Sequence, residues 1–115
     1  MSVKARLRSF GYAFKGLRTL VLEQANARIH LLATVSVIGL GLNQGLARLE
    51  WVAILLCVAM VWCAEALNTS LEYLCDAVHP EHHQLIERAK DVAAAGVLVC
   101  AAISVAVAAL VFFPL

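Results

Sequence analysis

The feature that most constrains this chain is a series of long segments without a charged side chain. Residues 29–47, 51–64 and 92–115 contain no Asp, Glu, Lys or Arg. A helix rises about 1.5 Å per residue, so about 20 apolar residues cross the roughly 30 Å of hydrocarbon in a bilayer. We therefore predict an all-α membrane protein with transmembrane helices at residues 29–47, 51–78 and 86–113.

The composition is also typical of a protein that lies in a lipid bilayer. Apolar residues make up 63% of the chain and charged residues 15%, which is unlike a soluble domain. The formal net charge of +1 gives no basic surplus for nucleic-acid binding, so lipid is the expected partner. With 115 residues the chain has room for one domain, residues 1–115, and one copy would hardly enclose a polar site, so we expect self-association.

Residues 1–28 form a different kind of segment. Apolar residues recur at alternating steps of four and three, which places them on one helical face: Val3, Leu7, Phe10, Phe14, Leu17 and Val21. Basic residues lie off that stripe. This pattern predicts an amphipathic helix on the surface of an anionic leaflet. We expect a tight turn at residues 48–50 and a polar loop that begins at His79 and contains Pro80.

The basic residues also predict the orientation. Of the nine Lys and Arg, only Arg48 lies at the end of the bundle opposite the N-terminus. By the positive-inside rule, the N-terminus and the loop after residue 78 face the cytoplasm.

The second predicted transmembrane helix carries polar residues in its cytoplasmic half. Glu65, Asn68, Glu72 and Asp76 stand at i, i+3, i+7 and i+11, or about 0°, −60°, −20° and +20° around a helix. We call these four residues the polar stripe. An ionisable side chain at the membrane centre costs at least about 2.5–3.5 kcal/mol on insertion scales, so it indicates a function. Asp76, at the water-facing end, is equally explained by solvation.

A second charged group begins the third predicted transmembrane helix: Glu87, Arg88, Lys90 and Asp91. The small residues 93–96 that follow allow close helix approach. Opposite a carboxylate stripe, Lys90 suits a phosphate partner and Asp91 suits a metal or nucleotide. Three uses of this arrangement are open from the residues alone: a kinase, a small proton- or cation-conducting oligomer whose stripe lines a pore, and a structural subunit. A kinase predicts that the stripe meets Lys90 and Asp91 across helices.

Several motifs together resemble the small bacterial lipid kinases, the diacylglycerol kinase and undecaprenol kinase family. They are EALNTSLE at 65–72 followed by Asp76, FKGLRT at 14–19, NARIHL at 26–31, the loop of Pro80, Glu81 and His83, and AKDVAAAGVL at 89–98. The NARIHL and AKDVAA runs look more like the undecaprenol kinase branch.

The resemblance implies a homotrimer in the bacterial cytoplasmic membrane, with active sites between subunits on the cytoplasmic side. It implies transfer of the γ-phosphoryl group of MgATP to a primary lipid hydroxyl. By position, Glu65 matches the general base, Asn68 its substrate-binding neighbour and Glu72 a metal- and nucleotide-binding glutamate. Asp76 would support them. The other positions that match nucleotide contacts are Tyr12, Glu81, His82, His83, Lys90 and Asp91.

The chemistry of the residues agrees with these roles. A lipid alcohol is a poor nucleophile, and a carboxylate shielded from water suits the removal of its proton. Magnesium prefers carboxylate and phosphate oxygens, so Glu72 with the ATP phosphates is a suitable set. One departure from the family concerns the other metal-binding glutamate, which aligns with Gln24, while this chain has Glu23 just before it. Either Glu23 reaches the ion from a slightly shifted helix, or Gln24 stands at the site, one charged ligand is missing and the affinity for magnesium is lower.

Overall fold

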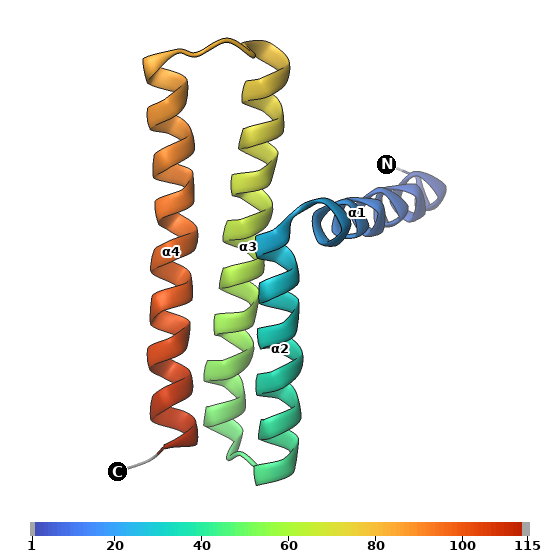
Figure 1. Ribbon diagram of the computed structural model, residues 1–115. Helices are drawn as coiled ribbons and strands as arrows, with labels where there is room; N and C mark the ends of the chain where they lie inside the picture. Colours follow the sequence, from blue (N-terminus) through green and yellow to red (C-terminus); the bar gives the residue numbers. More distant parts are fainter. Residues whose placement is uncertain (1, 114–115) are drawn as a thin grey trace.

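The computed structural model describes residues 2–113 and contains four helices in that range. They are α1 (Val3–Glu23), α2 (Ala25–Gln44), α3 (Arg48–Val78) and α4 (Gln84–Phe112). Helices α2, α3 and α4 are long and apolar enough to cross a membrane. Figure 1 shows α2, α3 and α4 running roughly alongside one another, while α1 projects sideways from them. The prediction of an all-helical protein with three candidate membrane spans is confirmed.

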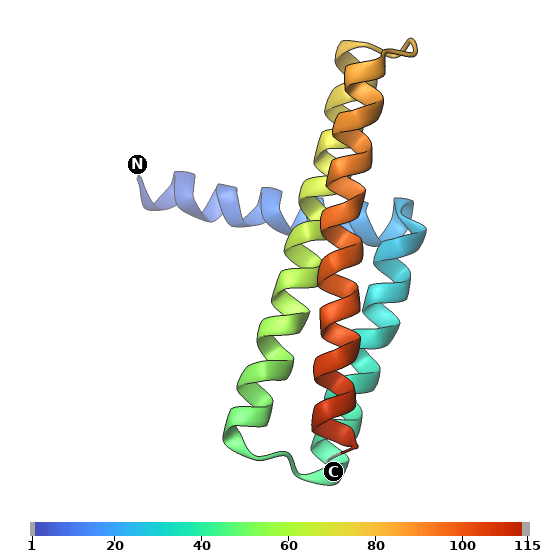
Figure 2. The same ribbon diagram turned by 90° about the vertical axis from the view of Figure 1, so that its left-hand side faces the viewer.

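The helices differ in reach. At 1.5 Å per residue, α3 with 31 residues spans about 46 Å and α2 with 20 residues about 30 Å. Helices α3 and α4 therefore extend beyond α2 at the end that carries their connecting loop, as Figure 2 also shows. Helix α3 packs most extensively against α4, and it packs against α2 as well.

The helix ends have local causes. Ser2 Oγ accepts a hydrogen bond from the Ala5 amide and caps α1, and Glu50 Oε1 accepts from the Ala47 amide at the start of α3. Gly45 ends α2 with a φ of 70°, a left-handed conformation that favours glycine. The turn between α2 and α3 is therefore at residues 45–47, and residues 48–50, predicted as the turn, begin α3.

The other boundaries moved by a few residues. Helix α2 starts at Ala25, within the segment predicted as the surface helix region, and α4 starts at Gln84 rather than residue 86. The break between α1 and α2 falls at Gln24, which has an extended backbone. The Arg28 guanidinium donates to the Val21 and Leu22 carbonyls and so holds the last turn of α1 against the first turn of α2. No glycine or proline marks this elbow, so sequence patterns give little sign of it.

The core of a single chain is small. Within residues 2–113, five apolar side chains are buried: Leu20, Ala27, Ile54, Val61 and Val97. Large apolar side chains are exposed along all four helices, and on α1 they include every residue of the predicted stripe except Val21, which is partly buried. Exposed apolar surface on this scale indicates lipid or further protein contacts.

Candidate active site

The inner end of the polar stripe of α3, together with Thr69, holds the best-buried polar side chains of the described chain. Glu65 is 1% exposed, Thr69 4% and Asn68 6%. Glu72 is half-buried and Asp76 is exposed, so burial decreases along the helix toward the loop. This gradient agrees with the predicted course of the stripe, from the interior of the bundle to the water.

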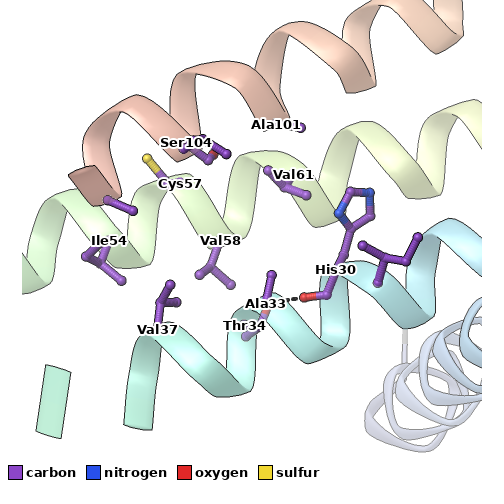
Figure 3. A pocket seen from close by; sticks show the side chains of 13 residues that line it. His30, Ala33, Thr34, Val37, Ile54, Cys57, Val58, Val61, Ala101 and Ser104 are labelled. Carbon is purple, nitrogen blue, oxygen red and sulfur yellow. Dashed lines mark hydrogen bonds between the residues drawn. The ribbon is translucent and has the colours of Figure 1, made fainter. Parts of the chain in front are cut away.

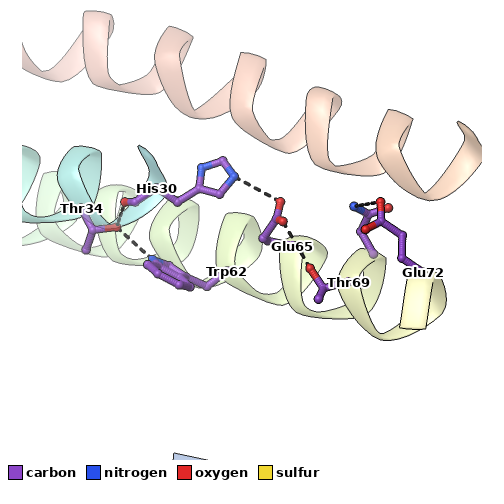
Figure 4. A network of polar contacts seen from close by, with 7 residues as sticks. His30, Thr34, Trp62, Glu65, Thr69 and Glu72 are labelled. Atoms are coloured by element: carbon purple, nitrogen blue, oxygen red, sulfur yellow. Dashed lines mark hydrogen bonds and ion pairs between the residues drawn. The ribbon is translucent and has the colours of Figure 1, made fainter. Parts of the chain in front are cut away.

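Glu65 lies between two polar neighbours, as Figure 4 shows. Its Oε1 accepts a 3.4 Å hydrogen bond from Thr69 Oγ1, one turn further along α3. Its Oε2 lies 3.4 Å from His30 Nε2 on α2. The His30 side chain is only 12% exposed, so the carboxylate and the imidazole are both largely shielded from solvent between α2 and α3.

His30 was not assigned a role from the sequence, although it lies in the NARIHL run. It is an ionisable side chain within an otherwise uncharged span, and that signal could have identified it. Its imidazole packs edge-on against the Trp62 ring, with centroids 6.4 Å apart. Trp62 Nε1 donates to Thr34 Oγ1, and Thr34 Oγ1 donates to the His30 carbonyl, so a hydrogen bond joins α3 to α2 beside the imidazole.

Toward the loop, the residues of the stripe lie beside α4 instead of α2. Asn68 Nδ2 lies 3.5 Å from Glu72 Oε1, a long hydrogen bond. Lys90 Nζ donates to Asp76 Oδ1 at 2.7 Å and links α4 to α3. The prediction that the stripe meets Lys90 and Asp91 across helices is therefore confirmed for Lys90, which contacts the outermost residue of the stripe. Within residues 2–113, Asp91 forms no side-chain hydrogen bond or ion pair with the stripe.

The loop between α3 and α4 borders a second polar site. A cavity of about 290 Å³ lies beside the loop, lined by His79–His83, Ile86, Glu87, Lys90 and Asp91. His83 Nδ1 accepts from the Leu85 amide and caps α4, which leaves the proton of a neutral ring on Nε2. His82 Nε2 lies 2.9 Å from Glu87 Oε2. Most of the residues predicted to contact nucleotide, Glu81, His82, His83, Lys90 and Asp91, are thus gathered at this cavity.

Two sets of predicted residues lie elsewhere. Tyr12 is 65% exposed on α1 and does not line the loop cavity. Glu23 is exposed, whereas Gln24 Nε2 donates to the Tyr73 hydroxyl at 3.4 Å, beside Glu72 in sequence. Among residues 2–113, no three His, Cys, Asp or Glu side chains gather as a metal site. The side-chain oxygens of Glu72 and Gln24 are nonetheless of the type that magnesium prefers, since this ion binds few carboxylates and keeps phosphate and water oxygens around it.

An apolar cavity of about 270 Å³ lies on the other side of His30, deeper in the bundle (Figure 3). Helices α2, α3 and α4 all line it. His30, Thr34 and Ser104 are its polar lining side chains, and the rest are apolar: Ile29, Ala33, Val37, Ile54, Cys57, Val58, Val61, Ala101, Val105 and Ala108.

Comparison with known proteins gives a consistent result. A family model described as prokaryotic diacylglycerol kinase matches residues 11–112. The chain is 34% identical over 107 residues to the undecaprenol kinase of Bacillus subtilis, covering 93% of this chain and 87% of that protein. It is 28% identical over 99 residues to the diacylglycerol kinase of Escherichia coli K12, covering 86% and 81%. The chain belongs to the prokaryotic diacylglycerol kinase family.

Proposed function

We propose that this protein is a membrane lipid kinase, which transfers the γ-phosphoryl group of ATP to the hydroxyl of undecaprenol or diacylglycerol. Its relatives are named for kinases of these two lipids, and the fuller coverage of the match to the undecaprenol kinase, 93% of this chain and 87% of that protein, favours undecaprenol. The observation that carries the proposal is Glu65, a carboxylate buried between apolar helices at the inner end of a polar stripe. A carboxylate so placed is suited to take a proton from a lipid alcohol.

Each part of the stripe has a proposed task. Glu65 is the general base, and Asn68 binds the lipid beside it. Glu72 contacts the nucleotide and the metal, and Asp76 supports Lys90 through their 2.7 Å contact. Lys90, Asp91 and the loop residues Glu81, His82 and His83 bind ATP, which their shared cavity supports. Phosphoryl transfer depends mainly on positioning and charge stabilisation, so a few side chains suffice.

Magnesium would be held by Glu72 together with the ATP phosphates. We propose Gln24 as the nearer additional ligand, because its side chain reaches Tyr73 on α3, with the exposed Glu23 as the alternative. When bound, the ion would neutralise charge that develops on the phosphates.

The elbow between α1 and α2 supports a membrane placement. Gln24 contacts Tyr73, eight residues and about 12 Å of helix rise from Glu65. If α1 lies on the cytoplasmic leaflet with its apolar stripe in the lipid, Glu65 is below the surface and the loop cavity projects into the cytoplasm. That depth suits a lipid hydroxyl on one side and ATP on the other.

We also propose a homotrimer with active sites between subunits. The exposed apolar surface of α2, α3 and α4 supports association, and Tyr12 does not line the loop cavity of its own chain. A neighbouring subunit would supply this tyrosine. Chemical cross-linking in detergent should then give three copies as the largest product.

The alternative of a proton- or cation-conducting oligomer has no support from the family membership. A pore also needs the stripe to face a central axis, whereas Glu65 faces His30 and Asp76 faces Lys90 within one chain.

The test is a phosphorylation assay. Purified protein in detergent, with MgATP and either undecaprenol or diacylglycerol, should yield the lipid monophosphate. Glu65→Gln should lower turnover by about 10²–10⁴-fold, the usual contribution of a general base, without loss of assembly. Glu50→Gln is the matched control, because it removes a carboxylate from the other end of α3. Full turnover by Glu65→Gln would disprove the role of Glu65.

A further inference from the structure

The buried pair of His30 and Glu65 has an unusual feature. His30 Nε2 and Glu65 Oε2 are 3.4 Å apart, yet within residues 2–113 neither atom has a hydrogen-bond partner of acceptable geometry. Buried polar atoms are nearly always paired, because an unpaired one has lost its hydrogen bonds to water. Two such atoms side by side indicate a missing polar group that would satisfy both.

The chemistry of the two atoms identifies that group. Glu65 Oε2 can only accept when the carboxylate is ionised, and His30 Nε2 donates when it carries the proton of the neutral ring. A hydroxyl is both donor and acceptor. An oxygen about 2.8 Å from each atom closes a triangle on their 3.4 Å separation, so one hydroxyl fits both.

We propose that His30 binds the acceptor hydroxyl of the lipid substrate, a role that rests on the proposed kinase function. His30 Nε2 donates to the hydroxyl oxygen, and the hydroxyl donates to Glu65 Oε2. During transfer the hydroxyl proton passes to the Glu65 carboxylate while the lipid hydroxyl oxygen forms a bond to the γ-phosphorus. The bond from that phosphorus to the bridging oxygen breaks, and ADP leaves with the electron pair. His30 keeps its proton and orients the nucleophile.

The surroundings of His30 fit this task. Trp62 contacts one side of the ring, and the Thr34–Trp62 hydrogen bond fixes α2 against α3 at this level. His30 also lines the apolar cavity of about 270 Å³, whose α3 residues, from Ile54 to Val61, come before Glu65 and lie deeper in the membrane. The hydrocarbon next to the hydroxyl would enter this cavity, so the substrate lies with its chain toward the bilayer centre and its hydroxyl toward Glu65.

The test compares a lipid alcohol with its deoxy analogue, in which hydrogen replaces the hydroxyl. Binding is measured without nucleotide, by displacement of a fluorescent lipid in mixed micelles. The wild-type protein should prefer the alcohol by about tenfold, which corresponds to about 1.4 kcal/mol. His30→Phe keeps a ring against Trp62 but has no donor, and it should reduce the preference to less than threefold. His30→Gln keeps an N–H donor and should retain part of the preference.

Kinetics provide the second readout. His30→Phe should lower kcat/KM for the lipid about tenfold or more while the KM for ATP stays within twofold. Ser36→Ala is the control on α2, because Ser36 is exposed and bonds only within its own helix in the described structure. His30→Leu carries the same test if His30→Phe does not assemble.

Two outcomes separate the two proposals. If His30→Phe keeps the wild-type preference for the alcohol while Glu65→Gln is inactive, the role of His30 is refuted and the kinase function stands. If the wild-type protein phosphorylates neither lipid, or Glu65→Gln keeps full turnover, the proposed function itself fails.

Discussion

Gly41 offers the most direct test of how α2 and α3 pack. A Cβ atom placed on Gly41 would lie 2.7 Å from Trp51 Cη2 and 2.9 Å from Leu46 Cδ1. Carbon atoms in contact are normally about 3.5–4.0 Å apart. Leu46 can change its rotamer, but the rigid indole of Trp51 can move away only by tilting the start of α3. Gly39, two residues earlier in the same helix, has nothing within 4 Å of such an atom.

The magnitude follows from two opposing effects. Alanine is favoured over glycine in a helix by about 1 kcal/mol, and this gain applies to both positions. Forcing an extra carbon into a packed contact costs about 1–3 kcal/mol, and this cost applies only to Gly41→Ala. The free energy of unfolding should therefore be about 1–3 kcal/mol lower for Gly41→Ala than for Gly39→Ala.

Both variants can be unfolded by titration with a denaturing detergent and followed by circular dichroism. Gly41 lies at the opposite end of α2 from His30, so the folded fraction of either variant should keep normal kinase turnover. If Gly41→Ala gains as much stability as Gly39→Ala, the close approach of Trp51 to α2 is incorrect.

Three further predictions concern the ATP side and the elbow. Gln24→Glu places a carboxylate at the elbow and should lower the magnesium concentration needed for half-maximal activity. Glu23→Gln should change this concentration little. The reverse pattern would identify Glu23 as the magnesium ligand. Lys90→Met should raise the KM for ATP about tenfold, because a charge-assisted hydrogen bond to phosphate is lost. Asp76→Asn should raise the KM for ATP less, because Asp76 only contacts Lys90. An unchanged KM for ATP in Lys90→Met would show that Lys90 is not part of the nucleotide site. Arg28→Gln removes the side-chain cap of the last turn of α1 and should lower the free energy of unfolding, measured by thermal denaturation, by about 1 kcal/mol. An equal decrease in Arg18→Gln, which changes an exposed arginine, would show that the cap is not the cause.

Much of the fold and part of the site could be predicted from the sequence. The spans follow from hydrophobicity, because a bilayer requires about 20 apolar residues per crossing. The common face of Glu65, Asn68 and Glu72 follows from the 100° step of a helix, and their decreasing burial follows from depth. The turn was less predictable, because the left-handed Gly45, and not the charged Arg48 and Glu50, decides where α2 ends.

Sequence by itself determined which residues this protein can keep in a membrane and which side of α3 carries its acids, because both are properties of one helix in one solvent. Only the tertiary structure decided what those acids face. It put His30 of α2 against Glu65, Lys90 of α4 against Asp76, and Gln24 rather than Glu23 against Tyr73. These partners depend on how far each helix slides and rotates against the next, which is set by packing between helices and not by the pattern along any one of them.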